Sequence, residues 1–376
     1  MKKVLLTATV QSHICQFHKP LVQMLREHGE FEIHVAARNN LSEKNGLKLD
    51  FVDRIFDIPF ERSPFNFHNV KAYKQLKRII DENGYDYVHC NTPVGGVVTR
   101  LAARKARKSG TRVLYTAHGF HFYKGASMKN WLTYYPVEKI LAKLTDILIT
   151  INEEDYRLAK ERFSCHVARI HGIGVNAERY YPVSPQESIG LKKQYGFSAE
   201  DRILLCVGEL LQNKNQQQII KAMPRIIKAV PTAKLLLAGN GPNREGLDAL
   251  VKELQIQDHV VFLGYCTVLQ DYQRFTDVGI SCSIREGLGV NLIEAMMNNN
   301  PVVATKNRGH NELVIDGVNG YLVDVDDVVG MSDAVVSLMN NFEDANDKGK
   351  KGMQMASQYT DVAVKKELVH IYFGVF

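Results

Sequence analysis

The stretch Ile203-Leu204-Leu205-Cys206-Val207-Gly208-Glu209-Leu210 is a nearly continuous apolar run that meets a glycine at its end. Such a run predicts a strand buried on both faces, as in a parallel sheet. Similar runs recur, each followed by a turn and a helix-compatible stretch. They cover 4–10, 31–37, 54–59, 85–90, 112–119, 146–152 and 167–175, then 234–239, 260–265, 278–284, 301–305 and 321–324. The sequence therefore predicts an α/β protein with two doubly wound, Rossmann-like domains.

The length of 376 residues suits two such domains. We expect residues 1–177 to form the first and residues 178–356 the second, with the turn-rich stretch 176–201 as the crossing between them. Apolar residues recur at helical spacing in the tail, so residues 357–376 are expected to form a helix that packs back on the first domain. A catalytic cleft is expected between the domains.

The stretch Glu286-Gly287-Leu288-Gly289-Val290-Asn291-Leu292-Ile293-Glu294 predicts a site for a diphosphate and a ribose. Gly287 and Gly289 allow close backbone approach, and a helix beginning near Gly289 presents N–H groups that attract phosphate. Glu294 would lie in the second helical turn, where its carboxylate can accept hydrogen bonds from ribose hydroxyls. Taken alone, the spacing is equally compatible with a surface helix bearing solvated glutamates.

Three successive strand ends of the second half carry residues suited to the same ligand. Lys214 follows the first of these strands and can hold a diphosphate as a point charge. Gly208, Gly241 and Gly264 follow the first, second and third strands, on the side where open α/β sheets bind ligands. Each glycine alone could serve only a turn. Their joint order favours one nucleotide site.

Composition favours a cytoplasmic enzyme. Hydrophobic residues make up 45% of the chain, which is enough for two cores, and the start of the chain is unlike a secretory leader. No apolar run is long enough to span a bilayer. The six cysteines form no C-x-x-C pair and mostly lie in or beside predicted strands, so we expect neither disulfides nor a zinc site.

The net charge of +6 is unevenly distributed. Six basic residues crowd one segment of the first half, namely Arg100, Arg104, Lys105, Arg107, Lys108 and Arg112. A basic face of this kind suits an anionic membrane surface. From charge alone, a solvated helix face is the simpler interpretation. Nucleic acid is not an expected partner, because no recognised motif accompanies the charges.

Together these features resemble the retaining glycosyltransferases of family four, which are two-domain GT-B enzymes that use nucleotide-sugar donors. The resemblance covers essentially the whole chain. Besides Glu286 to Glu294, it rests on His118-Gly119-Phe120, Asn152-Glu153-Glu154, residues 172–176, Gly239-x-Gly241-Pro242 and residues 317–323. Residues 89–96, 115–122 and 307–310 resemble the EpsD type of exopolysaccharide glycosyltransferase more closely.

The resemblance implies a role for each predicted site residue. Glu286 would bind hydroxyls of the transferred sugar, Glu294 the ribose, and the backbone from Leu288 to Asn291 the diphosphate. Lys214 would steady the leaving group. His118 would face the donor sugar, although spacing alone favours a structural strand-end histidine. The implied catalytic residues are therefore His118, Lys214 and Glu286, with Gly208, Gly241, Gly264, Gly287, Leu288, Gly289, Val290, Asn291 and Glu294 binding the donor.

The resemblance also implies a mechanism. A dissociative front-face displacement retains the anomeric configuration, and the departing phosphate oxygen accepts the proton of the attacking hydroxyl. Lysine and helix N–H groups would neutralise the diphosphate, so we expect no metal or other cofactor and activity that survives chelation. The implied donor is a UDP-sugar. The implied acceptor is a carbohydrate or a polyprenyl-diphosphate-linked carbohydrate, and Arg104, Lys105, Arg107 and Lys108 are then candidates for peripheral contact with an anionic membrane.

Two departures from the family pattern keep other functions open. Glu209 stands where many members have an arginine that grips the diphosphate, and Arg285 or Arg308 could supply the missing charge. The first strand-end loop lacks the usual glycine pair, and its His13 or the nearby His18 could be a ligand contact or a surface residue. The alternatives are a non-catalytic nucleotide-sugar-binding partner in a polysaccharide assembly complex and a GT-B sugar-nucleotide epimerase.

Overall fold

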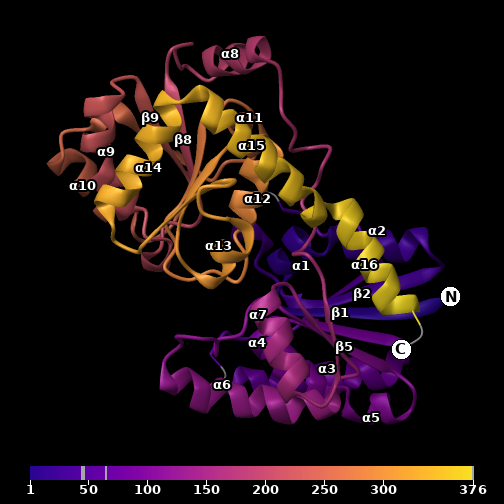
Figure 1. The fold of residues 1–376 in the computed structure, drawn as a ribbon. Helices are drawn as coiled ribbons and strands as arrows, with labels where there is room; N and C mark the ends of the chain where they lie inside the picture. Colours follow the sequence, from indigo (N-terminus) through magenta and orange to yellow (C-terminus); the bar gives the residue numbers. More distant parts are fainter. Residues whose placement is uncertain (44–46, 64–65, 375–376) are drawn as a thin grey trace. The chain divides into compact units, whose positions relative to one another are not determined.

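The computed structural model describes residues 1–43, 47–63 and 66–374. The chain divides into two compact units (Figure 1). The first unit comprises Met1–Gly174 with Asp361–Phe376, and the second comprises Val175–Thr360. Each unit is built on one parallel sheet, which confirms the predicted fold class.

The first unit contains a seven-stranded sheet in the order β3-β2-β1-β4-β5-β6-β7. Its strands are β1 (Lys2–Val10), β2 (Phe31–Arg38), β3 (Arg54–Asp57), β4 (Tyr87–Asn91), β5 (Arg112–Ala117), β6 (Ile147–Thr150) and β7 (His166–Arg169). The central strand β4 is buried throughout, including its polar residues His89 and Asn91. The predicted strand 167–175 is too long, because β7 ends at Arg169 and the positive φ angles of Gly172 and Gly174, 75° and 83°, interrupt the extended chain beyond it.

Helices cover both faces of the first sheet. Figure 1 shows α1, α2 and α16 on one side of the strands and α3, α4 and α5 on the other. The helices of this unit are α1 (Gln11–Phe17), α2 (Lys19–Glu27), α3 (His68–Asn83), α4 (Pro93–Ala102), α5 (Arg104–Lys108), α6 (Met128–Leu141), α7 (Glu153–Arg162) and α16 (Asp361–Phe373).

The second unit contains a six-stranded sheet in the order β10-β9-β8-β11-β12-β13. Its strands are β8 (Arg202–Val207), β9 (Ala233–Ala238), β10 (Val260–Gly264), β11 (Val278–Ser281), β12 (Val302–Thr305) and β13 (Gly320–Val323). Its helices are α8 (Pro185–Gln194), α9 (Gln217–Ala229), α10 (Arg244–Glu253), α11 (Leu269–Arg274), α12 (Val290–Met297), α13 (Arg308–Leu313), α14 (Val328–Asn340) and α15 (Phe342–Ala356).

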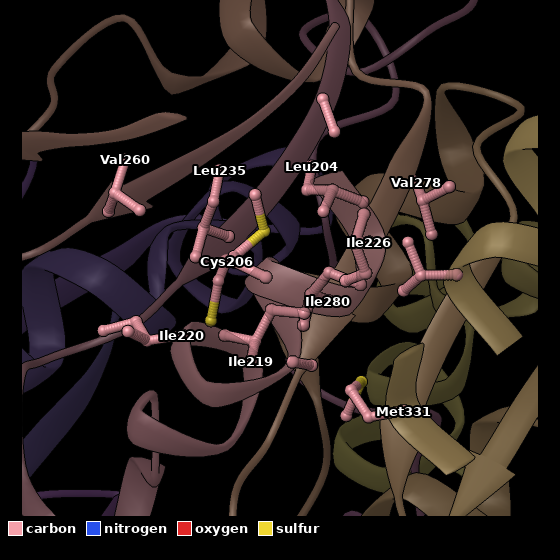
Figure 2. Packing of buried hydrophobic residues seen from close by; sticks show 14 of the residues in the cluster. Leu204, Cys206, Ile219, Ile220, Ile226, Leu235, Val260, Val278, Ile280 and Met331 are labelled. Carbon is pink, nitrogen blue, oxygen red and sulfur yellow. The ribbon is translucent and has the colours of Figure 1, made fainter. Parts of the chain in front are cut away.

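The core of the second unit fills the space between its sheet and the helices on one face (Figure 2). Leu204 and Ile280 from neighbouring strands pack with Ile219 of α9 and Met331 of α14, and all four are at most 1% exposed. Burial of such side chains contributes roughly 1.5–3 kcal/mol each. This core holds the strand ends in fixed register, and the candidate site is built on those ends.

The boundary between the units differs from the one we predicted. The chain passes from the first unit to the second between Gly174 and Val175 and returns between Thr360 and Asp361, rather than at 177/178 and 356/357. The stretch 176–201 lies wholly in the second unit and contains α8, so it is not the crossing. The tail forms α16 in the first unit, where the Tyr372 hydroxyl lies 2.7 Å from Nδ1 of His89.

The basic segment of the first half does not form one surface. Arg100 is 1% exposed and its Nη1 lies 2.8 Å from Oε2 of the buried Glu138. Arg107 is paired with Asp146 at 2.9 Å. Arg104, Lys105 and Lys108 are exposed. Within the described parts of the chain, no helix combines the length and apolar character needed to cross a membrane.

Candidate nucleotide-sugar site

The second sheet reverses its strand order between β8 and β11, which lie side by side. In open α/β sheets, ligands bind at such a reversal, outside the carboxyl ends of the strands. Lys214 follows β8 in a short 3-10 helix, Gln212–Lys214, and Glu286 follows β11. The reversal therefore brings together two residues that are 72 positions apart in the sequence.

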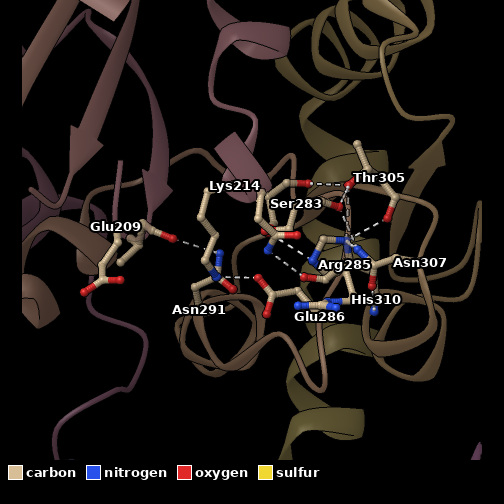
Figure 3. Close-up of polar contacts among 12 residues, drawn as sticks. Glu209, Lys214, Ser283, Arg285, Glu286, Asn291, Thr305, Asn307 and His310 are labelled. Atoms are coloured by element: carbon tan, nitrogen blue, oxygen red, sulfur yellow. Dashed lines mark hydrogen bonds and ion pairs between the residues drawn. The ribbon is translucent and has the colours of Figure 1, made fainter. Parts of the chain in front are cut away.

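Lys214 and Glu286 form an ion pair between Nζ and Oε1 (Figure 3). Their side chains are 27% and 15% exposed, so the pair is partly shielded from water. The loops that carry them are also joined. The side-chain amide of Asn213 donates to the carbonyl of Arg285 at 2.9 Å, and the backbone carbonyl of Asn213 accepts from the Ile284 N–H at 2.8 Å. The loop contacts hold the lysine and the carboxylate in one place.

The turn before α12 is compact and built around glycine. Gly289 occupies the N-cap position of α12, so the helix start has no capping side chain of its own. Leu288 and Gly289 are buried. Val290 begins the helix, and the Asn291 side-chain amide donates to the carbonyl of Val207 at the end of β8 at 3.3 Å. The N–H end of α12 therefore lies beside the β8 strand end, where an anion would benefit from the helix dipole.

A second segment, at the start of α13, packs against this turn. A Cβ on Gly309 would lie 3.0 Å from the Glu286 carbonyl and 3.0 Å from the Leu288 nitrogen, so only glycine fits without displacement. Arg308 donates from Nε to the Glu286 carbonyl at 3.4 Å. The structure thus brings Arg308 to the backbone carbonyl of Glu286. Arg285 also belongs to this turn and is exposed.

Glu294 lies in the second turn of α12, as predicted from a helix beginning near Gly289. Burial is the main cause that raises the pKa of its carboxyl to about 7. A hydrogen bond from the Tyr180 hydroxyl and the charge of Arg179 act in the opposite direction. A carboxylate in this position can exchange the Tyr180 hydroxyl for ligand hydroxyls.

The three strand-end glycines lie in loops that touch one another. A Cβ on Gly241 would lie 2.4 Å from the Leu210 carbonyl oxygen, which leaves no room for a side chain. Gly208 and Gly264 have φ angles of 159° and 67°, and the Gly264 carbonyl accepts from the Gly239 N–H at 2.7 Å. The loops at the ends of β8, β9 and β10 therefore form one continuous surface beside Lys214.

Glu209 is exposed, and Figure 3 shows its side chain directed away from Lys214. Its backbone carbonyl accepts a hydrogen bond from the Gln216 amide at 3.1 Å. The departure from the family pattern at this position leaves the Lys214–Glu286 pair intact.

Comparison with known proteins identifies the family. Residues 3–152 match the family described as "Glycosyl transferase 4-like", and residues 189–355 match "Glycosyl transferases group 1". A protein of Bacillus subtilis (strain 168) named "Putative glycosyltransferase EpsD" is 45% identical over 373 residues, which are 99% of this chain and 96% of that protein. The chain belongs to the group 1, 4-like glycosyltransferase family.

Two further comparisons extend this result. An Escherichia coli protein, named UDP-Gal:alpha-D-GlcNAc-diphosphoundecaprenol alpha-1,3-galactosyltransferase, is 24% identical over 312 residues, covering 81% of the glycosyltransferase described here and 80% of that protein. The crystal structure of Anabaena HepE in complex with UDP and glucose matches with a TM-score of 0.81 at 19% identity, over 100% of both chains. The likeness to HepE shows that the glycosyltransferase has the GT-B fold.

His118 of the glycosyltransferase belongs to the first unit, whereas every other predicted site residue belongs to the second. It follows β5, and its Nε2 lies 3.2 Å from Nε2 of His13 and 3.3 Å from Oδ1 of Asn91. Burial lowers the pKa of His118 to about 4, so the imidazole is neutral at neutral pH. Its contact with a donor sugar stays a prediction. His121 instead stacks on Tyr134, with ring centroids 4.6 Å apart.

Two residues of the glycosyltransferase site were not predicted. Tyr180, which is 7% exposed, hydrogen-bonds to Glu294 from a stretch in which the sequence indicated only turns. His310 is fully buried, donates from Nδ1 to the Thr305 carbonyl at 2.6 Å, and lies 3.0 Å from the Ser281 hydroxyl through Nε2. It would meet a Cβ on Gly289 at 3.1 Å, so it supports the α12 turn. The only sequence signal for His310 was the motif at residues 307–310.

Proposed function

We propose that this glycosyltransferase transfers a sugar from a nucleotide-diphosphate donor, a UDP-sugar, with retention of anomeric configuration. The proposed acceptor is a carbohydrate or a polyprenyl-diphosphate-linked carbohydrate used in bacterial exopolysaccharide synthesis. The observation that carries the proposal is the meeting of Lys214, Glu286 and the uncapped start of α12 at the strand reversal of the second sheet. These groups offer a cation, a carboxylate and helix N–H groups to one ligand.

The relatives support the choice of donor and acceptor. The name of the Escherichia coli relative specifies a UDP-sugar and a diphosphoundecaprenol-linked acceptor, and HepE was crystallised with UDP and glucose. The relative with 45% identity is named a putative glycosyltransferase EpsD, and our proposal of a role in exopolysaccharide synthesis rests on the resemblance of this chain to the EpsD type. Non-catalytic binding and epimerisation are not favoured, because the matched relatives are named as glycosyltransferases.

The proposed mechanism uses the residues of the site in distinct roles. Lys214 and the N–H groups of α12 stabilise the negative charge that develops on the departing diphosphate. Glu286 positions sugar hydroxyls, and Glu294 holds the ribose. Neutral His118 offers one donor and one acceptor nitrogen to a sugar hydroxyl. Because these groups neutralise the leaving group, we propose that transfer needs no metal ion.

A binding titration tests the donor assignment. Calorimetry with a panel of nucleoside diphosphates and nucleotide sugars, in the presence of chelator, should show preferential binding of one sugar nucleotide by the wild type. Glu294→Ala should lose that binding while keeping its fold, as judged by thermal unfolding. Failure of the whole panel to bind would reject the donor site. Consumption of donor without any acceptor would instead support an epimerase.

We also propose peripheral contact with an anionic membrane through the first unit. Helix α6 exposes large apolar side chains, with Met128 and Leu132 each 71% exposed and Ile140 64% exposed. Exposed Lys129 and Lys139 lie on the same helix. Exposed apolar residues and exposed lysines on one helix suit contact with a lipid headgroup boundary.

The basic residues predicted from the sequence adjoin this helix. Arg107 of α5 donates to the Lys143 carbonyl at 3.3 Å, just beyond the end of α6. Arg104, Lys105 and Lys108 are the exposed members of the basic segment. The proposed surface therefore combines the apolar face of α6 with the cations of α5, each of which adds about 1 kcal/mol near an anionic surface.

Vesicle sedimentation tests this contact. Leu132→Ser with Ile140→Ser, and separately Arg104, Lys105 and Lys108 changed to Gln, should each reduce binding to vesicles containing anionic lipid. Wild-type protein with vesicles of neutral lipid is the control for charge. Unchanged sedimentation of both variants would reject this surface.

A further inference from the structure

Three histidines of the first unit converge at its own strand reversal. The first sheet reverses between β1 and β4. His13 lies in α1 directly after β1, His18 lies at the junction of α1 and α2, and His118 follows β5. One ring nitrogen from each histidine lies within 4.8 Å of the other two. The cluster is independent of the Lys214–Glu286 pair, which belongs to the second unit.

The spacing of these nitrogens suits a tetrahedral metal. Nε2 of His13 and Nε2 of His118 are 3.2 Å apart. A zinc ion with Zn–N bonds of about 2.0–2.1 Å places tetrahedral ligand nitrogens about 3.3–3.4 Å apart. The ring nitrogen of His18 lies within 4.8 Å of the other two, and it would have to move closer through a side-chain adjustment. Two of the three ligand positions therefore already have the required separation.

His18 supplies a second, independent observation. Its side chain is 4% exposed, and its Nε2 is a buried atom without a hydrogen-bond partner among the residues that the structure describes. Its ring centroid lies 5.4 Å from that of His13 and 5.7 Å from that of His118. Buried polar atoms are almost always satisfied in folded proteins. An unpartnered imidazole nitrogen inside a histidine cluster points to a ligand that it binds.

A fourth histidine near the cluster is not part of the ligand set. The neighbouring His89 is already engaged, because its nitrogens lie 2.7 Å from the Tyr372 hydroxyl and 2.7 Å from the Thr116 hydroxyl. This leaves His13, His18 and His118 as the ligand set, and a bound metal would replace the 3.3 Å contact between Nε2 of His118 and Oδ1 of Asn91.

We propose that His13, His18 and His118 form a binding site for a transition-metal dication of the Zn²⁺ class, with the fourth position left to water. The cluster contains nitrogen ligands and no carboxylate. Imidazole ligands select zinc, cobalt, nickel and copper over magnesium and calcium, which prefer oxygen. The sequence argument against zinc considered only the cysteines, and the fold alone brings these histidines together.

The site has a consequence that rests on the proposed function. A bound metal occupies one of the two ring nitrogens of His118, and the mechanism uses both nitrogens to bind a sugar hydroxyl. Zinc should therefore inhibit transfer, whereas a chelator should leave activity intact because Lys214 and α12 neutralise the diphosphate. In this arrangement the metal is an inhibitor of the enzyme and not its cofactor.

Metal binding can be measured without any substrate. Tag-free protein, dialysed against chelator and then freed of it, is titrated with Co²⁺ and followed by its visible absorption, which is strong only in tetrahedral coordination. Zinc should displace the cobalt and raise the thermal unfolding temperature. We expect one tight site per chain in the wild type and in His68→Asn, an exposed histidine of α3 that serves as the matched control.

Replacement of the ligands decides the assignment. His13→Asn, His18→Asn and His118→Asn should each weaken metal binding by more than about tenfold, with unfolding curves in chelator confirming that the variants are folded. A cobalt spectrum typical of octahedral coordination, or binding by all three variants as tight as that of the wild type, would overturn the site and leave a hydrogen-bonded histidine cluster. Because the titration omits donor and acceptor, its outcome is separate from that of the donor-binding test.

Discussion

Lys214 and Glu286 are ion-paired across the ends of two adjacent parallel strands, although 72 residues separate them. The lysine that we assign to the donor diphosphate is therefore already neutralised by the carboxylate that we assign to the sugar. A diphosphate must compete with Glu286 for this cation. The pair thus sets the affinity of the empty site for a diphosphate. It also sets where the Lys214 and Glu286 side chains lie once the donor is bound.

Removal of the competing charge should strengthen diphosphate binding. Glu286→Gln keeps the side-chain shape but releases Lys214, so we expect the affinity for a nucleoside diphosphate to rise about 3–10-fold, as for a partly shielded ion pair. Sugar transfer should fall at the same time. Calorimetry and a transfer assay measure the two effects. Lys214→Met should weaken binding, and Glu286→Gln added to Lys214→Met should give no gain. A gain in that double variant would contradict the competition.

Donor affinity should depend on pH through Glu294. Its pKa is raised to about 7 mainly by burial, and ribose binding requires the ionised form to accept hydroxyl hydrogen bonds. Affinity for a nucleoside diphosphate should therefore rise as the pH increases from about 6 to 8 and level off above the pKa. The matched Glu294→Gln variant should bind more weakly with a flatter profile. The same slope in both proteins would assign the pH dependence to another group.

Stability should change with pH in the opposite sense. The folded protein holds the Glu294 proton more tightly than the unfolded chain, in which a glutamate carboxyl has its ordinary pKa of 4.5. The protonated form therefore stabilises the fold, and this contribution is lost as the pH rises from about 4.5 through 7. Relative to Glu294→Gln, wild type should lose up to about 3 kcal/mol between about pH 5 and 8. Urea unfolding of both proteins at the two pH values measures the difference.

The buried pair of Arg100 and Glu138 should be important for the first unit. The guanidinium lies 4.0 Å from the centre of the Tyr115 ring, and Nε donates to the Gly96 carbonyl at 2.9 Å. Arg100→Met leaves the Glu138 carboxylate buried without its cation, so we expect a loss of about 3–5 kcal/mol in the free energy of unfolding. Adding Glu138→Leu should recover part of this loss. A double variant less stable than the single one would show that the pair is not the cause.

The close approach of the strand-end loops should make Gly241 intolerant of a side chain. Gly241→Ala places a methyl group 2.4 Å from the Leu210 carbonyl oxygen, so the loops must separate, with a loss of about 1–3 kcal/mol and weaker nucleotide binding. Gly246→Ala in α10 is the matched control, because its methyl group meets open space. That helix substitution should be neutral or stabilising. Thermal unfolding and nucleotide titration of the two variants compare them directly, and equal effects would reject the steric argument.

The strands and the α12 segment could be predicted because their signals are local. Continuous apolar runs mark parallel strands in both units, and glycine at residues 287 and 289 marks the turn before a helix that places Glu294 in its second turn. The prediction failed where contacts are not local. Arg100 has the sequence appearance of a surface charge, but α4 directs it inward to Glu138. The stretch 176–201 contains α8 in the second unit, although turn residues suggested a linker.

The sequence by itself determined the fold class, the number of sheets and the residue types gathered at the candidate site, because hydrophobic periodicity and glycine turns act over a few residues. Only the tertiary structure decided which charged and polar side chains meet. The strand reversal of the second sheet pairs Lys214 with Glu286, and the reversal of the first sheet gathers His13, His18 and His118. The strand order of each sheet brings these side chains together. That order follows from the packing of whole helices on sheets rather than from any short segment.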